Sequence, residues 1–284
     1  MTLTIEPGVV VNGNDDYSLS LKGSLSAVGT SASKIILNNV RISSTSSTGT
    51  ESGAVSIQYC EMNSGYLSNG YNKFILRDSK LYGVRSVSIY YPRSDWYIER
   101  NIFQNSGGIY TDSTSDVTGN IYIYIKNNVF YQQKGDCAVS NDYSREPANT
   151  IVEYNSFLSI DRVALYLNSS SASKMMAVNN YWNTTDKNII NAMIHDKNDD
   201  LNIKNAIVYE PFLTSPHPNT PASPITEPVL TVWPISRDVP AAGGTTFFGV
   251  ANSGCGNSPG PPRLFQAVIG CPFLPATVQP IRAP

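Results

Sequence analysis

The chain has 284 residues, and its 20 Lys and Arg stand against 22 Asp and Glu, a formal net charge of −2. This balance argues against sequence-independent binding of nucleic acid, which needs a surplus of cations to displace counterions from the phosphates. Only 15% of the residues are charged, below the roughly 25% usual in soluble domains. The difference is made up by Ser, Thr, Asn, Gly and 17 Tyr, a composition that suggests β structure outside the cytoplasm.

The start of the chain carries no basic segment followed by an apolar one, so no signal peptide is expected. No membrane span is expected either, because no run approaches about 18 apolar residues. The chain is then either cytoplasmic or a mature form of an exported protein. Four cysteines match no zinc spacing, and Cys255 and Cys271 either close a short loop or are free thiols. Cys60 and Cys137 are expected about three turns of the fold apart, too far for a disulfide.

A short phrase recurs along the chain, in which β-branched and aromatic residues alternate before an Asn or Asp, once a Cys. These marker residues are separated by 18 to 27 residues, with a mean of about 23.5, and are Asn39, Cys60, Asp78, Asn101, Asn128, Asn155 and Asn180. A variable period of this size is typical of one turn of a parallel β-helix. With two further turns expected before the first marker, we predict an all-β fold of about nine to ten rungs, about 45 Å long.

The phrase also predicts which side chains line the interior. The column three residues before the marker is Ile36, Ile57, Ile75, Ile98, Ile125, Val152 and Ala177. The column two residues after it is Met62, Phe103, Phe130, Phe157 and Trp182, and Ile42 and Leu81 lie three residues after Asn39 and Asp78. The marker is expected at a sharp corner, because Asn tolerates the left-handed backbone conformation and its amide can bond to the next turn.

These phrases resemble the asparagine ladder of right-handed parallel β-helix proteins, the pectate-lyase-like superfamily, over about residues 3–213. Residues 179–186 and 209–213 are similar to the closing segment of secreted or cell-surface members. The resemblance implies a right-handed coil and an extracellular or cell-surface location. It does not imply one activity, because lyases, hydrolases, epimerases, adhesins and passive rods share this architecture.

The closing segment predicts a short helix flanking the β-helix, with Thr185 as N-cap and Asp186 in its first turn. Its apolar stripe is Ile189, Ile190, Met193 and Ile194. We therefore divide the chain into a β-helix at 1–213, a proline-rich linker at 214–229 and a partial β-sandwich-like or disordered tail at 230–284. Residues 239–246 weakly resemble the start of BACON domains, small immunoglobulin-like modules, although the later strands of that module are missing.

Candidate ligand-binding residues lie two and four positions before the marker, where side chains of successive turns stack on the outside. They are Tyr97, Glu99, Tyr124, Lys126 and Glu153, and tyrosine faces suit stacking on sugar rings. The alternative is an ordinary exposed sheet with Glu–Lys–Glu pairs across the turns. No catalytic residue is assigned; were the chain an enzyme, Glu99, Glu153 and Arg100 would be the candidates. Arg77, Arg93 and Arg162 are further candidates for a base.

No metal site or cofactor is assigned. Asp196, Asn198 and Asp200 begin like a calcium loop and leave calcium open, but Leu201 stands where an EF-hand needs Gly, and no Glu follows at position twelve. A turn capped by side chains is the alternative. His195 and His217 lie at the predicted helix end and in the linker, so histidine-based catalysis is not expected.

Three functions remain open. The first is a non-catalytic extracellular or cell-surface protein with a structural or adhesive role, self-assembling end to end through an uncovered first rung. The second is a polysaccharide lyase or glycoside hydrolase that uses the outward Tyr/Glu/Lys face, and the third is a carbohydrate-binding module. The expected partners are further copies of the chain or a polysaccharide.

Overall fold

The computed structural model describes residues 1–14, 18–46, 49, 51–113, 121–144, 149–169 and 174–223, and four short strands beyond them. The chain divides into two compact units, Met1–Pro224 and Ile225–Pro284.

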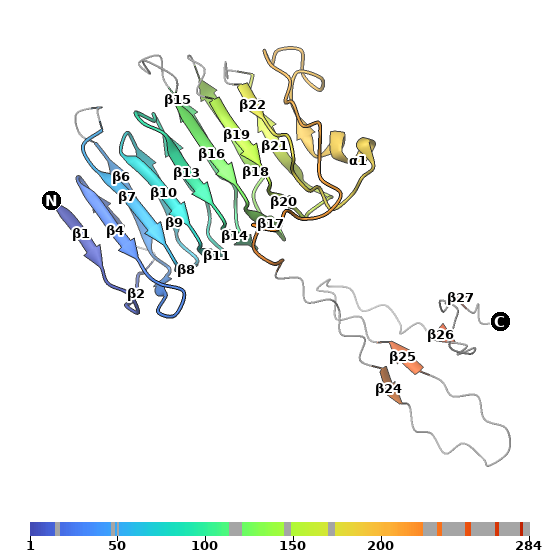
Figure 1. Ribbon diagram of the computed structural model, residues 1–284, viewed down its shortest axis with the longest axis horizontal. Helices are drawn as coiled ribbons and strands as arrows, with labels where there is room; N and C mark the ends of the chain where they lie inside the picture. The colour runs from blue at the N-terminus through green and yellow to red at the C-terminus, as the bar shows by residue number, and fades with distance from the viewer. Residues whose placement is uncertain are drawn as a thin grey trace. The chain divides into compact units, whose positions relative to one another are not determined.

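The first unit is a parallel β-solenoid built from three sheets (Figure 1). Sheet A contains β1 (Thr2–Ile5), β4 (Ser24–Val28), β7 (Ala54–Gln58), β10 (Lys73–Arg77), β13 (Trp96–Glu99), β16 (Tyr122–Lys126), β19 (Asn149–Glu153) and β22 (Lys174–Met176). Sheet B contains β2 (Val10–Asn12), β5 (Ile35–Asn38), β8 (Cys60–Asn63), β11 (Lys80–Tyr82), β14 (Ile102–Gln104), β17 (Val129–Tyr131) and β20 (Ser156–Phe157). Sheet C contains β3 (Leu19–Leu21), β6 (Arg41–Thr45), β9 (Tyr66–Gly70), β12 (Val87–Tyr90), β15 (Ile109–Ser113), β18 (Cys137–Ser144), β21 (Val163–Leu167) and β23 (Ile194–His195).

The solenoid has about seven turns, because the three sheets hold 8, 7 and 8 strands. The prediction of nine to ten rungs was wrong at both ends. Strands β1, β2 and β3 form one turn together instead of two, and the chain after Tyr181 adds only isolated bridges and one short parallel strand, β23. At about 4.8 Å between strands, seven turns span roughly 34 Å instead of 45 Å.

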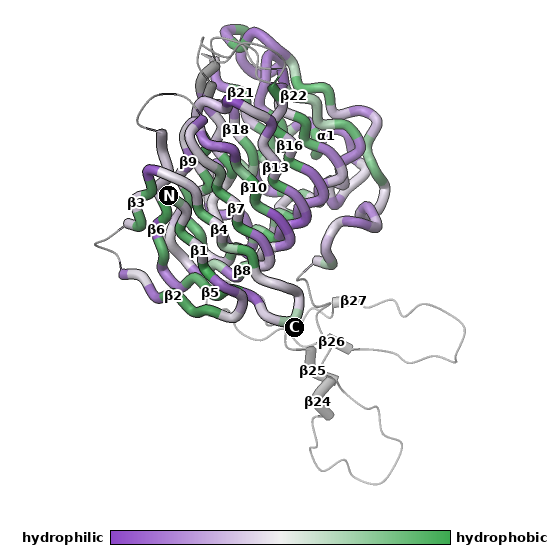
Figure 2. Tube along the Cα trace, turned by 60° about the vertical axis from the view of Figure 1, so that its left-hand side comes forward, coloured by the Kyte–Doolittle hydropathy of each residue, from purple (hydrophilic) through white to green (hydrophobic). Residues whose placement is uncertain are grey.

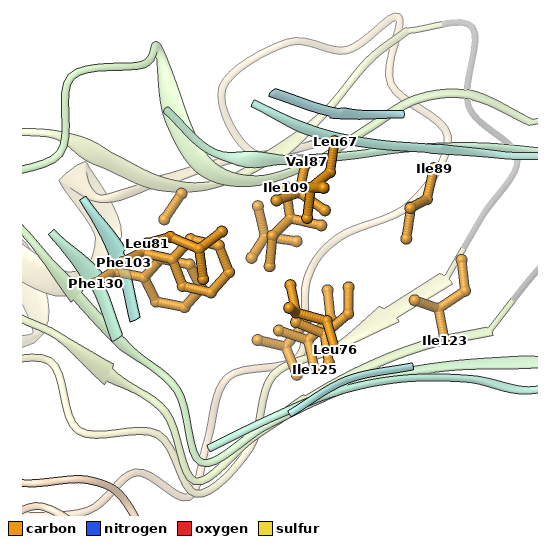
Figure 3. Packing of buried hydrophobic residues seen from close by; sticks show 14 of the residues in the cluster. Leu67, Leu76, Leu81, Val87, Ile89, Phe103, Ile109, Ile123, Ile125 and Phe130 are labelled. Carbon is orange, nitrogen blue, oxygen red and sulfur yellow. The ribbon is translucent and has the colours of Figure 1, made fainter. Parts of the chain in front are cut away.

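Inward side chains from the three sheets meet in one continuous core (Figure 3). Most strands alternate buried and partly exposed residues, as in Lys73–Arg77, so that each sheet contributes a column of apolar side chains. The rings of Phe103, Phe130 and Phe157 from sheet B and of Trp182 beyond it stack in sequence, with centroid distances of 4.9, 5.2 and 4.9 Å. Burial of each such side chain contributes about 1.5–3 kcal/mol to folding, which makes this core the main source of stability.

Most of the predicted inward columns are confirmed. Ile57, Ile98, Ile125, Val152 and Ala177 are fully buried in one column, and Met62, Phe103, Phe130, Phe157 and Trp182 are buried in the other, where Leu81 joins them. Ile36 and Ile75 were assigned wrongly, because both point outward, while Leu37 and Leu76 beside them are buried. Ile42 is buried as well, but in sheet C, opposite Leu67.

The corner between sheets A and B holds a buried ladder of polar side chains. Each backbone N–H donates to the side chain of the next turn: Asn101 to Asn128 Oδ1 at 2.9 Å, Asn128 to Asn155 Oδ1 at 2.8 Å, and Asn155 to Asn180 Oδ1 at 2.8 Å. Ser79 and Cys60 continue the ladder, since the Cys60 N–H donates to Ser79 Oγ at 3.0 Å. The ladder thus satisfies corner backbone groups that water cannot reach.

Two markers and one conformation were predicted wrongly. Ser79 and not Asp78 occupies the ladder, and Asn39 lies at the corner between sheets B and C. The left-handed residue is the one before each ladder position, with φ between 49° and 60° at Tyr59, Asp78, Arg100, Asn127, Tyr154 and Asn179. These side chains are not among the buried ones, so the left-handed position accepts varied residue types, and Figure 2 shows hydrophilic residues gathered along such corners.

The C-terminal end of the solenoid is covered by α1 (Lys187–Ala192) and the chain that follows it. Asp186, and not Thr185, is the N-cap, because its side chain accepts a hydrogen bond from the Asn188 N–H at 2.9 Å. Ile190, Met193 and Ile194 are buried in the core as predicted, whereas Ile189 is exposed. No helix in the described part of the chain is long and apolar enough to cross a membrane.

The second unit contains two antiparallel strand pairs, β24 (Val232–Pro234) with β25 (Phe248–Val250) and β26 (Phe265–Gln266) with β27 (Gln279–Pro280). The segment that resembles BACON domains, and Cys255 and Cys271, lie outside the described residues. Cys60 and Cys137 are buried free thiols on β8 and β18, three turns apart as predicted.

Candidate functional site

The predicted ligand-binding residues lie together on the outer face of sheet A. The register pairs Tyr97 with Tyr124 and Glu99 with Lys126, and it pairs Lys126 with Glu153 in the next turn. The predicted stacking across turns is therefore confirmed, whereas the role of these residues in binding stays a prediction. Arg77, opposite Glu99, extends the charged column by one turn.

Charges alternate along this column and neutralise one another. Arg77 Nε lies 2.8 Å from Glu99 Oε2, with the N–H not aligned for a hydrogen bond, and Lys126 Nζ lies 2.9 Å from Glu153 Oε2. At the adjacent corner Arg100 forms a bidentate pair with Asp78, at 2.7 and 2.8 Å. This hydrogen bonding raises the pKa of the Arg100 guanidinium above its ordinary value. Arg100 is therefore engaged with Asp78 at this corner.

The tyrosine rings on the same face are covered by their neighbours. The Tyr97 and Tyr124 rings stack at 5.3 Å, and Tyr122 stacks on Tyr124 at 5.7 Å. Arg77 lies over the Tyr97 ring at 4.9 Å, and Lys126 lies over Tyr124 at 5.0 Å. Partial burial, followed by the nearby Asp95, raises the pKa of Tyr124 above its ordinary value. Ring faces that are already in contact with other rings and cations offer little free surface to a sugar.

The four candidate bases do not converge. Arg77 and Arg100 both approach Glu99 Oε2, at 2.8 and 3.8 Å. Arg93 instead donates from Nε to the Gly49 carbonyl at 3.1 Å and lies over the Tyr71 ring. Arg162 is exposed in the segment before β21. The arrangement is that of a surface ion-pair network, in which each predicted carboxylate already has a cation beside it.

The calcium alternative at Asp196, Asn198 and Asp200 is not supported by the geometry. Asp196 is buried, and its two carboxylate oxygens accept the N–H groups of Asn198 at 2.7 Å and Ile207 at 2.6 Å. Asp200 accepts the Asn202 N–H in the same way. Within the described ranges no group of three His, Cys, Asp or Glu could hold a metal ion. These side chains cap the turn between β23 and the closing segment, which is the alternative that the sequence left open.

The two histidines pack against tyrosines. His195 stacks on Tyr166 at 4.8 Å. The His217 ring lies 4.5 Å from that of Tyr154, and its Nδ1 is 3.1 Å from Asn127 Nδ2. Thr220, three residues later, donates its hydroxyl to the Tyr154 carbonyl at 2.6 Å. Residues 217–220, part of the predicted linker, therefore contact the corner between sheets A and B.

One concave feature was missed from the sequence. A hollow of about 430 Å³ lies at the corner between sheets B and C, over the second to fourth strands of those sheets. We call it the corner hollow, and it is lined by Asn39, Arg41, Ser64, Gly65, Tyr66, Gly83 and Arg85. Apart from Asn39, these residues lie outside the repeated phrase, so only the true register of the turns brings them together.

No protein-family model matches the chain, and no curated protein and no solved structure matches it.

Proposed function

We propose that this chain is a right-handed parallel β-helix that acts outside the cell or at its surface as a non-catalytic structural or adhesive protein. The right-handed coil and the location follow from the resemblance of residues 3–213 to the pectate-lyase-like superfamily. The low fraction of charged residues, 15%, agrees with a surface that is polar mainly through hydroxyls and amides.

The observation that carries the proposal is the mutual neutralisation of the sheet A face. General acid–base chemistry needs a carboxylate or a base that can exchange a proton with substrate. Glu99 and Glu153 instead lie within 2.9 Å of Arg77 and Lys126, respectively. Cross-strand pairs of opposite charge stabilise a sheet by roughly 0.2–1 kcal/mol each, which gives these side chains a structural role.

The test is an assay of the full chain against a panel of acidic and neutral polysaccharides, with detection of unsaturated products and of new reducing ends. We expect no turnover by the wild type or by Glu99→Gln and Glu153→Gln. Both variants should lose no more than about 1 kcal/mol of stability, because the pairs are partly exposed to solvent. Turnover that disappears in Glu99→Gln or Glu153→Gln would establish the alternative, a lyase or hydrolase that uses this face.

Self-association through the first turn is the second part of the proposal. Leu3 lies opposite the buried Leu25 in sheet A, yet it is 38% exposed, because β1 is paired on one side only. The opposite end of the solenoid is covered by α1 and the closing segment. Two copies that meet at their first turns would bury these edges and close into a dimer.

Light scattering on the eluting protein, with negative-stain electron microscopy, tests this contact. A mass twice that of the chain is expected, and Leu3→Glu should return the protein to a monomer. A wild-type monomer at every concentration up to the solubility limit would remove self-association from the proposal.

A further inference from the structure

We propose that the outer face of sheet A is a contact surface for a second copy of this chain. The two copies pack face to face around a two-fold axis that runs parallel to the strands and passes between the paired strands β13 and β16. This contact is separate from the one proposed at the first turn and does not depend on it. With both contacts each copy has two different partners, so that copies are joined into an open chain, and this last step alone rests on the proposed function.

An apolar stripe runs along the outer face of sheet A, beside the charged column. Its members pair in register from turn to turn and are all at least partly exposed: Ile75, Tyr97, Tyr124, Ile151, Met176 and Val208. Met176 and Val208 are 46% and 53% exposed. Single apolar side chains are common on protein surfaces, whereas a contiguous row of them is typical of an interaction site. Tyr and Met are also enriched in protein–protein interfaces.

The charged column beside this stripe is complementary to its own reverse. In order of turns it is positive, negative, positive and negative: Arg77, Glu99, Lys126 and Glu153. These side chains are between 18% and 29% exposed, so each can still meet a partner. A two-fold axis parallel to the strands reverses the order of the turns and keeps the position along each strand. Arg77 therefore faces Glu153 of the second copy, and Glu99 faces Lys126 of the second copy.

The alternation of charge also sets the register of the contact. If the axis is moved by half a turn, onto β13, Glu99 faces Glu99 of the second copy, and Arg77 faces Lys126 of the second copy. Like charges then oppose one another along the whole column, which disfavours that register. The axis between β13 and β16 is the one that places an opposite charge across from every member of the column.

The same axis brings the two apolar stripes together, and the size of the face predicts a weak contact. Tyr97 faces Tyr124 of the second copy, and Ile75 faces Ile151 of the second copy. Eight strands of up to five residues cover roughly 550 Å² at the usual strand spacing. Two such faces bury about 1,100 Å² in total, less than the roughly 1,600 Å² of a standard stable interface. We therefore expect a dissociation constant above about 10 μM.

Sedimentation equilibrium of the full chain with Leu3→Glu tests this contact in the absence of the one at the first turn. We expect the mass of one chain in dilute solution and an approach to twice that mass between about 10 μM and about 1 mM. The association should weaken as salt is added, because salt screens partly exposed charges. A mass of one chain over this whole range would overturn the proposal, and it would leave the first-turn contact, which the wild type tests, unaffected.

Two further variants, both made in the Leu3→Glu chain, locate the contact. Ile151→Lys places a charge in the apolar stripe and should weaken the association about tenfold or more. The double variant Lys34→Glu/Glu61→Lys reverses a similar ion pair that lies outside sheet A, so it should associate like its parent. Circular dichroism and the melting temperature show whether each variant is folded. Association that Ile151→Lys leaves unchanged, or that the double variant weakens equally, would overturn the assignment to this face.

A mixing experiment in the same Leu3→Glu chain tests the two-fold arrangement. Arg77→Glu and Glu153→Lys each place like charges opposite one another, so each variant alone should associate about tenfold more weakly than the parent. In an equimolar mixture Glu at 77 faces Lys at 153, and the association should return to within about threefold of the parent. Each variant carries the same internal change alone and in the mixture, so recovery reports on the contact between copies.

The partner of Arg77 distinguishes the proposed axis from its neighbours. Arg77→Glu mixed with Glu99→Lys should show no recovery, because Glu99 faces Lys126 of the second copy and not Arg77. Recovery in that mixture would mean that the axis lies between β10 and β13 and would overturn the proposed register. Absence of recovery in the mixture of Arg77→Glu with Glu153→Lys would overturn the two-fold arrangement.

Discussion

The buried side chain of Asn128 makes four hydrogen bonds within the ladder. Its Oδ1 accepts the backbone N–H and the Nδ2 of Asn101, at 2.9 and 3.0 Å, and its Nδ2 donates to the Ile98 carbonyl and to Asn155 Oδ1, at 2.8 and 3.0 Å. Asn128→Ala should destabilise the protein by about 2–4 kcal/mol, because it removes the side-chain partners of the buried Asn101 N–H and Ile98 carbonyl in the preceding turn. Denaturant unfolding monitored by circular dichroism measures this change.

An exposed asparagine ladder in the same protein provides the matched control for that prediction. On the outer face of sheet B, Asn38 donates to Asn12 at 2.8 Å and accepts from Asn63 at 2.9 Å. Asn38→Ala removes two similar side-chain bonds where water can replace them, so it should cost no more than about 0.5 kcal/mol. Equal losses of stability in Asn128→Ala and Asn38→Ala would mean that burial does not determine how much the ladder's hydrogen bonds stabilise the protein.

The buried thiols predict a loss of stability at alkaline pH. Burial raises the pKa of Cys60 and of Cys137 from 9.0 to about 12. Between these values the unfolded chain releases protons that the folded chain retains, so stability falls as the pH rises. Each thiol contributes a slope of about 1.4 kcal/mol per pH unit in this window. Below pH 9 both the folded and the unfolded chain keep these protons, so the two thiols should add no pH dependence to the free energy of unfolding.

The double variant Cys60→Ala/Cys137→Ala isolates this effect from that of the tyrosines and lysines. Its free energy of unfolding should decline less steeply than that of the wild type between pH 9 and 11, with the difference between the two proteins shrinking as the pH rises. Parallel curves would show that the thiols titrate alike in the folded and unfolded chains.

At the scale of the strand, the sequence predicted columns well wherever the repeated phrase was complete. The four turns that carry Asn101, Asn128, Asn155 and Asn180 have both of their apolar columns as predicted. The reason is physical, because side chains in a strand alternate between its two faces. Only one register places both apolar residues and the amide of the phrase inside. The complete phrase was therefore sufficient to predict these turns.

The turn of Cys60 was predicted correctly, but the turn after it was not predicted to the residue, because its ladder position is Ser79, which does not resemble the amides elsewhere. Asp78 stands beside Ser79 and has the chemistry of a marker, so the predicted register slipped by one residue and placed Ile75 inside. Asn39 has the same chemistry at a different corner. The corner hollow was not predicted for this reason, since its residues come together only when residues 39, 64 and 83 are recognised as equivalent corners of successive turns.

At the scale of the whole molecule, the solenoid and the segment that returns along it form one unit. The apolar core runs from Leu25 to Ile207, and Pro224 closes the first unit. A chain of residues 1–224 should therefore melt within about 2 °C of the full chain, because every core residue in the described part of the chain lies in the first unit. A chain of residues 1–213 should be less stable by about 1–2 kcal/mol, because it loses the Thr220 hydrogen bond to Tyr154 and the His217 contact.

Scanning calorimetry of the three chains separates these effects, and Thr220→Val in the full chain should reproduce part of the loss. If the 1–213 chain melted like the 1–224 chain, the returning segment would be a passive linker; if the 1–224 chain melted far below the full chain, the boundary between the units would be wrong.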